Sequence, residues 1–278
     1  MFTGLKDLIE QDDIIKSDKY LWHSQTCFNC FYHPSSLVFR SDYWRDNLVD
    51  SLIKVQVPHG KKTLILGHSD QRIRLTTLLA GIMRGFNQVR AINASNYTSR
   101  LSSIPLGITN FSKDATPFNI LGDLQIMLEA TDSTPRINDY NGTLLANFSV
   151  ISNLKKRNKL LKILENIEIK NLNPDYSRFG RLNFLQQVRK QSYVLCPEGN
   201  GVDTHRIWET LYLGGVPIIL SSNVLNPLLA ELPVLIIHNW KELYDKKFLE
   251  NKWYEIQTKE YNYEKLKASF WIKSFCSF

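Results

Sequence analysis

A loop with two glycines precedes a charged segment in the second half of the chain, and this order of residues suits an anionic ligand. The apolar run 193–196 stops at Pro197. The loop that follows contains Gly199, Asn200 and Gly201. Because glycine has no Cβ, the backbone of such a loop can come close to a ligand.

The residues after this loop predict a helix whose start faces the loop. Asp203 or Thr204 can cap the helix. Gly214 and Gly215 can end it before the next apolar run, 216–220. Because free N–H groups and the positive dipole end gather at a helix start, we expect a phosphate site there.

Three ionisable side chains on the predicted helix could act on one ligand. Arg206 and Glu209 are three residues apart and share a face, and His205 lies on a neighbouring face. Arg206 could contact a diphosphate, and Glu209 could accept hydrogen bonds from ribose hydroxyls. The alternative is a surface ion pair beside glycines that only turn the chain.

Segment 192–220 resembles the donor-binding signature of exostosin-like glycosyltransferases, which have the GT-B fold. The family pattern, C-P-x-G-N-G-x-D-T-H-R-x-W-E-x-L-Y-x-G followed by a V-P-I strand, is matched at nearly every position. The segment departs from the pattern at Glu198, where a basic residue is common. The two glutamates eight residues apart of retaining GT-B enzymes are absent, because Gly201 stands eight residues before Glu209.

Two other stretches resemble parts of the same family. Residues 146–153 and the basic run that ends at Arg157 resemble the first strand and loop of the donor domain. Residues 104–110 resemble a loop at the end of the family's first domain. A solvated helix start and a plain turn are the alternatives. The donor-binding residues that the resemblance implies are Asn147, Arg157, Gly199, Asn200, Gly201, Asp203, Thr204, His205, Arg206 and Glu209.

The resemblance implies a hexosyl or pentosyl transferase that moves a sugar from a nucleotide-diphosphate sugar to a glycan or other hydroxyl acceptor. Negative charge then builds up on the leaving diphosphate. The chain has no Asp-x-Asp motif, so Arg206, the helix start and Arg157 are expected to hold this charge without a metal or other cofactor. For inversion, the base would be Asp70 or, second, His68. Retention, and a helix-capping role for Asp70, are the alternatives.

Apolar β-rich runs alternate with amphipathic segments, which is typical of α/β folds with parallel sheets. We expect strands over 62–66, 88–92, 144–151, 193–196, 216–220 and 234–237. Helices are expected near 75–82 and over 154–166, 179–190, 204–213, 240–249 and 261–275. The predicted fold class is two Rossmann-like α/β domains that face a cleft, with ligands outside the carboxyl ends of the strands.

The polar segment 131–142 contains proline and glycine and is the best candidate for a linker. It separates an N-terminal acceptor-side domain at 1–135 from a C-terminal nucleotide-sugar-binding domain at 143–260. Residues 261–278 are expected to form a helix that could pack back on the N-terminal domain.

The composition is that of a globular protein, with 43% hydrophobic and 22% charged residues among 278. The formal net charge of +7 suits a nucleoside diphosphate, an acidic lipid surface or nucleic acid. Because the basic residues are scattered and lack an aromatic platform, nucleic acid is not the expected partner. A protein that binds a nucleotide or sugar without turnover remains an alternative.

Neither a membrane-spanning segment nor a signal peptide is expected. No stretch approaches the roughly 18 apolar residues of a spanning helix, and residues 1–7 reach an acidic side chain before an apolar run forms. We therefore expect a cytoplasmic protein with, at most, peripheral contact to a membrane. Cys27 and Cys30 with His23 and His33 could hold zinc, but free thiols beside surface histidines are the simpler interpretation.

Overall fold

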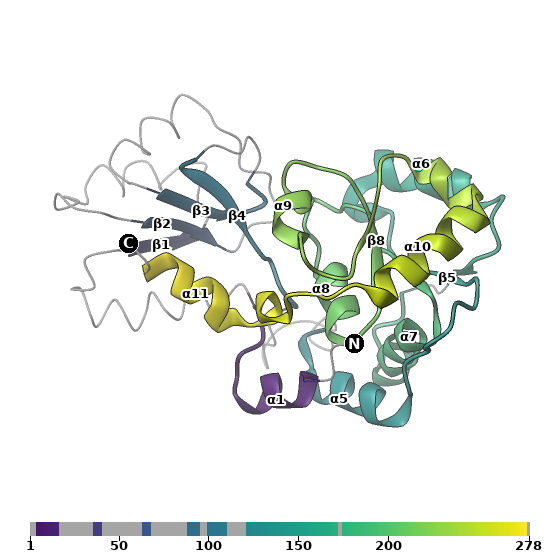
Figure 1. Cartoon of the computed structure of the whole chain (residues 1–278), viewed down its shortest axis with the longest axis horizontal. Coiled ribbons are helices and arrows are strands. Elements are labelled where there is room, and N and C mark those ends of the chain that lie inside the picture. Colours follow the sequence, from purple (N-terminus) through teal and green to yellow (C-terminus); the bar gives the residue numbers. More distant parts are fainter. Residues whose placement is uncertain are drawn as a thin grey trace.

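The computed structural model of the chain describes residues 4–16, 36–40, 63–67, 88–94, 99–109, 121–171 and 174–276. Within these ranges the strands form two parallel sheets, as the alternation in the sequence predicts. In Figure 1 the first sheet, β1 to β4, lies on the left and the elements of the second sheet lie on the right. Across the same ranges, every helix falls short of the length or apolarity needed to span a bilayer.

The first sheet follows the order of the chain, and its described strands are all parallel. They are β1 (Ser36–Arg40), β2 (Thr63–Gly67), β3 (Gln88–Ile92) and β4 (Leu101–Ile104). The predicted strands 62–66 and 88–92 correspond to β2 and β3. The sequence pattern alone predicts neither β1 nor β4.

The second sheet has the strand order β6-β5-β7-β8-β9, and each neighbouring pair is parallel. Its strands are β5 (Leu144–Ala146), β6 (Lys170–Asn171), β7 (Tyr193–Leu195), β8 (Val216–Leu220) and β9 (Leu235–Ile237). After β5 the chain forms β6 on one side and then crosses to form β7 on the other. The strand order therefore reverses between β5 and β7, which is where open α/β sheets bind ligands.

Helices connect the strands of the second sheet, as parallel pairing requires. They are η3 (Ile151–Asn153), α6 (Leu154–Leu164), α7 (Arg178–Lys190), α8 (His205–Tyr212) and α9 (Leu225–Leu229). After the last strand, β9, come η4 (Trp240–Tyr244) and α10 (Lys246–Thr258). The predicted helices 154–166, 179–190 and 204–213 correspond to α6, α7 and α8. The expected helix 240–249 is instead two helices, because Asp245 caps a new start at α10.

The remaining described helices belong to the two ends of the chain and to the segment before β5. They are α1 (Leu5–Glu10), α5 (Leu124–Ser133), η5 (Tyr263–Leu266) and α11 (Ala268–Cys276). Although α5 lies within the expected N-terminal domain, 1–135, it packs against α7, which connects two strands of the second sheet. In the expected linker, the buried Arg136 donates hydrogen bonds to Gly214 O at 2.8 Å and to Gln191 O at 2.7 Å. The domain boundaries stay predictions.

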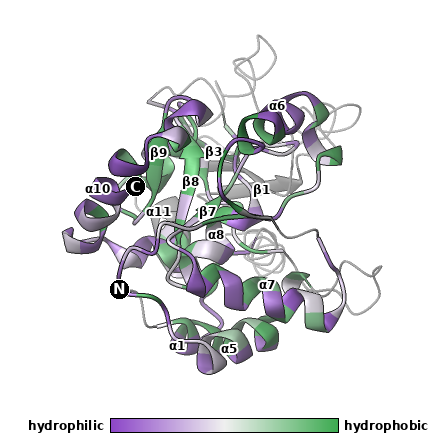
Figure 2. Cartoon of the chain, turned by 90° about the vertical axis from the view of Figure 1, so that its right-hand side faces the viewer, coloured by the Kyte–Doolittle hydropathy of each residue, from purple (hydrophilic) through white to green (hydrophobic). Residues whose placement is uncertain are grey.

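Alternate side chains of the second sheet enter hydrophobic cores on its two faces. In β7, Tyr193 and Leu195 belong to the core with α6 and α10, and Val194 belongs to the core with α7 and α8. Figure 2 shows β7 to β9 as mostly hydrophobic, in green, and α10 with many hydrophilic residues, in purple. The core of α7 and α8 continues to Ile92 and Ile104 of the first sheet. Both halves of the chain therefore share a core.

Segments near the two ends of the chain contact each other and the end of α8. The Tyr212 hydroxyl, at the end of α8, accepts a hydrogen bond from Ile15 N at 2.9 Å and donates one to Leu266 O at 2.7 Å. Asp13 Oδ1 accepts a hydrogen bond from Ser269 N, near the start of α11, at 2.6 Å. From there α11 extends toward the first sheet (Figure 1).

Candidate functional site

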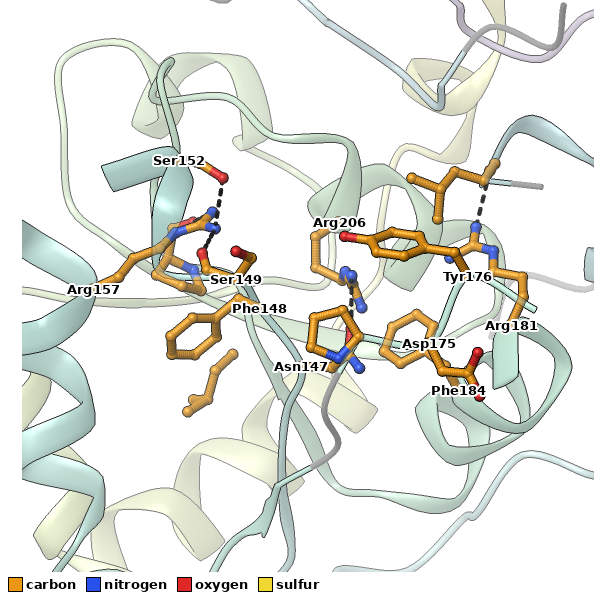
Figure 3. Close-up of a pocket in the computed structure, with 14 residues that line it drawn as sticks. Asn147, Phe148, Ser149, Ser152, Arg157, Asp175, Tyr176, Arg181, Phe184 and Arg206 are labelled. Atoms are coloured by element: carbon orange, nitrogen blue, oxygen red, sulfur yellow. Dashed lines mark hydrogen bonds between the residues drawn. The ribbon is translucent and has the colours of Figure 1, made fainter. Parts of the chain in front are cut away.

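A cavity opens at the carboxyl ends of β5 and β7, where the strand order reverses (Figure 3). Most of its lining comes from the segments after β5, before α7 and at the end of β7, and from helices α6, α7 and α8. The lining residues are Leu121, Asn147, Phe148, Ser149, Ser152, Arg157, Pro174, Asp175, Tyr176, Arg181, Phe184, Leu195, Pro197 and Arg206. This is the edge of the sheet at which the sequence predicts a ligand. Three arginines and one acidic residue, Asp175, take part in the lining, so its formal charge is positive.

Arg206 lines the cavity from α8, and only part of its guanidinium is hydrogen-bonded within the described part of the chain. Its Nη2 donates a hydrogen bond to Asn147 Oδ1 at 3.1 Å, and its guanidinium carbon lies 3.9 Å from the centre of the Phe184 ring (Figure 3). Its Nε and Nη1 have no hydrogen-bond partner among the described residues. Burial lowers the pKa of Arg206, and the Glu209 carboxylate acts in the opposite direction. A desolvated cation whose N–H groups are not all hydrogen-bonded is suited to an anion.

Glu209 is shared by two arginines. Its Oε1 accepts a hydrogen bond from Arg181 Nη2 at 2.6 Å, and its Oε2 lies 3.5 Å from Arg206 Nε. Burial acts to raise the pKa of Glu209, but Arg181 and then Arg206 outweigh it, so the pKa is lowered. The predicted placement of Arg206 and Glu209 on one helix face is confirmed. Glu209 is not among the lining residues, and its ribose contact stays a prediction.

Arg157, at the start of α6, joins the two loops that follow β5 and β7. Its Nη1 donates hydrogen bonds to Ser149 O and, at 3.2 Å, to Ser152 Oγ. In the second loop, it donates to Pro197 O at 3.2 Å and to Glu198 O at 3.0 Å. Burial is the main reason that the pKa of Arg157 is lowered. Arg157 therefore holds both loops in place and adds positive charge to the cavity.

The glycine loop packs closely against Arg157. A Cβ at Gly199 would lie 3.2 Å from Arg157 Nη2, and Gly199 N donates a hydrogen bond to Gly201 O at 3.0 Å. Asn200 between them is exposed. The close approach expected at Gly199 therefore exists, but Arg157 is the group that comes close. None of these three loop residues is among the lining residues, and their contact with a ligand stays a prediction.

Asp203 and His205 contact the loop after β4. Asp203 Oδ2 accepts a hydrogen bond from Leu106 N at 2.7 Å, and its Oδ1 accepts one from Trp208 Nε1 at 2.8 Å. His205 Nδ1 lies 2.8 Å from Gly107 O. These contacts connect the start of α8 to the first half of the chain.

Asn93, which follows β3, extends the same contact. Its Oδ1 accepts hydrogen bonds from Val202 N at 2.9 Å and from Asp203 N at 2.8 Å. Thr204 is the N-cap of α8, but its side chain makes no capping hydrogen bond. Of the four residues Asp-Thr-His-Arg, Arg206 is the one that lines the cavity. Asp203 and His205 instead contact the loop after β4.

Arg181 is a lining residue that no sequence motif marks. Its side chain is 2% exposed, and its Nη2 also donates a hydrogen bond to Leu121 O at 3.0 Å. Helical spacing is the signal that could have identified it, because Arg181 shares the buried face of α7 with Phe184 and Leu185. A charged group on an apolar face needs a buried partner, and Glu209 is that partner.

The predicted catalytic residues Asp70 and His68 lie outside the described residues. The same holds for the four residues considered for zinc, which are His23, Cys27, Cys30 and His33. Within the described ranges, no three His, Cys, Asp or Glu side chains gather as a metal site would require.

Part of the chain is similar in sequence to a known protein. No protein-family model matches the chain. The chain is similar to a probable glycosyltransferase of Arabidopsis thaliana, with 26% identity over 171 residues. The matched region covers 56% of this chain and 30% of that protein.

Proposed function

We propose that this chain is a glycosyltransferase that takes a sugar from a nucleotide-diphosphate sugar and transfers it to a glycan or another hydroxyl acceptor. The observation that carries the proposal is Arg206, which lines a cavity where the second sheet reverses its strand order and whose buried Nε and Nη1 have no hydrogen-bond partner among the described residues. The similarity to a protein named as a probable glycosyltransferase supports it. The resemblance of segment 192–220 to an exostosin-like donor signature favours the same class.

In this proposal, Arg206 binds the diphosphate of the donor and stabilises the charge that develops on it as the sugar leaves. Asn147 orients the guanidinium through its Oδ1. Arg157 fixes the loops after β5 and β7 around the ligand. Because these protein cations can hold the leaving group, the reaction is proposed to need no metal ion.

Other predicted donor residues hold α8 and the preceding loop, 199–201, in place. Asp203 and His205 hold the start of α8 against the loop after β4, and Thr204 lies between them. The loop 199–201, which includes Asn200, packs against Arg157. These contacts favour a positioning role, because a misplaced Arg206 would lose its ligand geometry.

We further propose the two-domain GT-B arrangement, with the parallel sheets as the centres of two Rossmann-like domains. The acceptor side is then assigned to the first sheet. For an inverting reaction, Asp70 is the proposed base that takes the acceptor proton, with His68 as second candidate. Asp70→Asn should keep donor binding and lose transfer, and undiminished turnover in this variant would reject Asp70 as the base.

The proposal is tested first by donor binding and then by transfer. A thermal-shift panel of UDP, GDP, CDP and their sugars should raise the melting temperature with one nucleotide family, because a ligand that binds the folded state stabilises it. The matching sugar should then pass from the labelled donor to a glycan acceptor. Stabilisation by none of these nucleotides would contradict the donor site. Binding without any transfer would instead favour a protein that binds the nucleotide without turnover.

A further inference from the structure

The buried charges beside the cavity do not balance. Arg181 and Arg206 lie on either side of the single carboxylate of Glu209. The two side chains of the Arg181–Glu209 pair are 2% and 4% exposed, whereas Arg206 is 22% exposed. Two cations that share one anion leave one positive charge uncompensated, and in a desolvated place this charge attracts an anion strongly.

The distances show which arginine Glu209 holds. The Arg181–Glu209 contact is 2.6 Å, a charge-assisted hydrogen bond. The contact between Arg206 Nε and Glu209 is 3.5 Å, longer than a well-formed hydrogen bond. Arg181 is also anchored to Leu121 O. The carboxylate charge is therefore taken up mainly by Arg181.

Because Arg181 takes up most of the Glu209 charge, Arg206 is only weakly paired with that carboxylate. Its Nη2 binds the neutral amide oxygen of Asn147, and its Nη1 has no hydrogen-bond partner among the described residues. Without Arg181, the Glu209 carboxylate would be left with Arg206 as its nearest cation and would close the bidentate contact that Arg206 now lacks. Arg206 would then be neutralised from within the protein.

We propose that Arg181 keeps Arg206 available for an anionic ligand by holding the Glu209 carboxylate. Arg181 is thus a positioning residue, and Glu209 is an internal counter-ion that competes with the ligand for Arg206. The inference rests on the proposed diphosphate site at Arg206, but on no further step of sugar transfer. It also assigns Glu209 a role that needs no ribose.

Calorimetric titration with inorganic pyrophosphate, which has no ribose, tests the inference. Arg181→Met should weaken pyrophosphate binding by about tenfold or more, as expected for the loss of one charge-assisted contact at Arg206. The matched control is Arg178→Met on the same helix, since Arg178 pairs with Glu129 at an exposed position. That control should bind within roughly threefold of the unchanged protein.

A double variant separates this role from a direct contact between Arg181 and the ligand. In Arg181→Met with Glu209→Gln, no carboxylate competes for Arg206, so pyrophosphate binding should recover to within roughly threefold of the unchanged protein. If Arg181 itself binds the ligand, the double variant will stay as weak as Arg181→Met, and this result would overturn the inference.

A second variant and the unchanged protein separate a failure of the inference from a failure to fold or to bind diphosphate. If Arg181→Met does not fold, Arg181→Lys takes its place; it keeps the charge that holds Glu209 and should bind pyrophosphate within roughly threefold of the unchanged protein. A loss of tenfold or more in folded Arg181→Lys would count against the inference. If the unchanged protein binds no pyrophosphate at all, the proposed diphosphate site itself fails. Binding that depends on Arg206 but not on Arg181 rejects only the positioning role.

Discussion

Asp203 carries a carboxyl group that the fold removes from water almost completely. It is 2% exposed, and its two oxygens accept hydrogen bonds from Leu106 N and Trp208 Nε1. Burial raises the pKa of this carboxyl to about 7, although the N–H donors around it favour the ionised form. The folded protein therefore keeps a proton on Asp203 at pH values where the unfolded chain, with a pKa of about 3.9, has released it.

This difference predicts that Asp203 makes the free energy of unfolding fall as the pH rises from about 4 to about 7. The contribution is at most about 1.4 kcal/mol per pH unit, because one proton is involved. Asp203→Asn has no such group to titrate. Urea unfolding at about pH 5, 6 and 7 should therefore show a steeper decline for the unchanged protein than for Asp203→Asn. Parallel pH profiles would contradict a protonated Asp203.

Among the site residues, those marked by local motifs could be predicted from the sequence, and those set by long-range packing could not. Arg206, Arg157 and Asn147 come from the motifs, and all three line the cavity. The contact of Asp203 with Leu106 could not be predicted, because Leu106 is 97 residues away and a local pattern does not encode how the halves pack. The role of Arg181 could not be predicted from a motif either, because its partner, Glu209, is on another helix.

At the scale of elements, the loop after β4 meets the N-terminal segment at Gly107. Its φ is +72°, in the left-handed region. A Cβ there would lie 2.0 Å from Ile15 O, the oxygen that accepts a hydrogen bond from Ile108 N at 3.0 Å. Gly142 has nearly the same φ, +71°, but a Cβ there would meet only Tyr140 Cε1 at 4.0 Å.

Alanine at these two positions separates backbone strain from close approach. Gly142→Ala should lower the free energy of unfolding by about 1–2 kcal/mol, the cost of a left-handed conformation. Gly107→Ala should lower it by at least about 2 kcal/mol more, because Ile15 must move and its hydrogen bond is lost. Chemical denaturation measures both values. Equal losses would show that nothing approaches Gly107 closely.

The strands that the sequence predicts well are continuous apolar runs or have apolar residues at alternate positions. The expected strand 216–220 matches β8, and 88–92 matches β3. The expected strand 144–151 ends at Ala146, because the chain from Asn147 onward turns into the lining of the cavity. The short strand β4, with two serines in four residues, has no apolar pattern that would reveal it.

At the scale of the whole molecule, the alternation of the sequence predicts the two parallel sheets, but not how the ends of the chain hold them. The Tyr212 hydroxyl joins α8 to Ile15 near one end and to Leu266 near the other. Burial raises the pKa of this phenol, so the hydroxyl keeps its proton and can both donate and accept.

Tyr212→Phe should therefore lower the free energy of unfolding by about 2 kcal/mol or more, because Ile15 N and Leu266 O both lose a buried partner. Tyr244→Phe is the control, since the Tyr244 side chain is 46% exposed and its hydroxyl donates to Ile163 O at 3.3 Å. The control should change the stability by less than about 0.5 kcal/mol. Thermal or urea unfolding of both variants makes the comparison. Equal losses of stability would show that the Tyr212 hydroxyl does not join the two ends of the chain.

The central claim is that the cavity at the strand reversal binds the diphosphate of a nucleotide sugar through Arg206. Calorimetric titration of the unchanged protein, Arg206→Ala and the exposed-site control Arg178→Ala with the nucleoside diphosphate found by thermal shift tests it most directly. We predict that Arg206→Ala weakens binding about 30-fold or more, which corresponds to about 2 kcal/mol for a desolvated charged contact. Arg178→Ala should bind as the unchanged protein does. Undiminished affinity in folded Arg206→Ala would contradict the account.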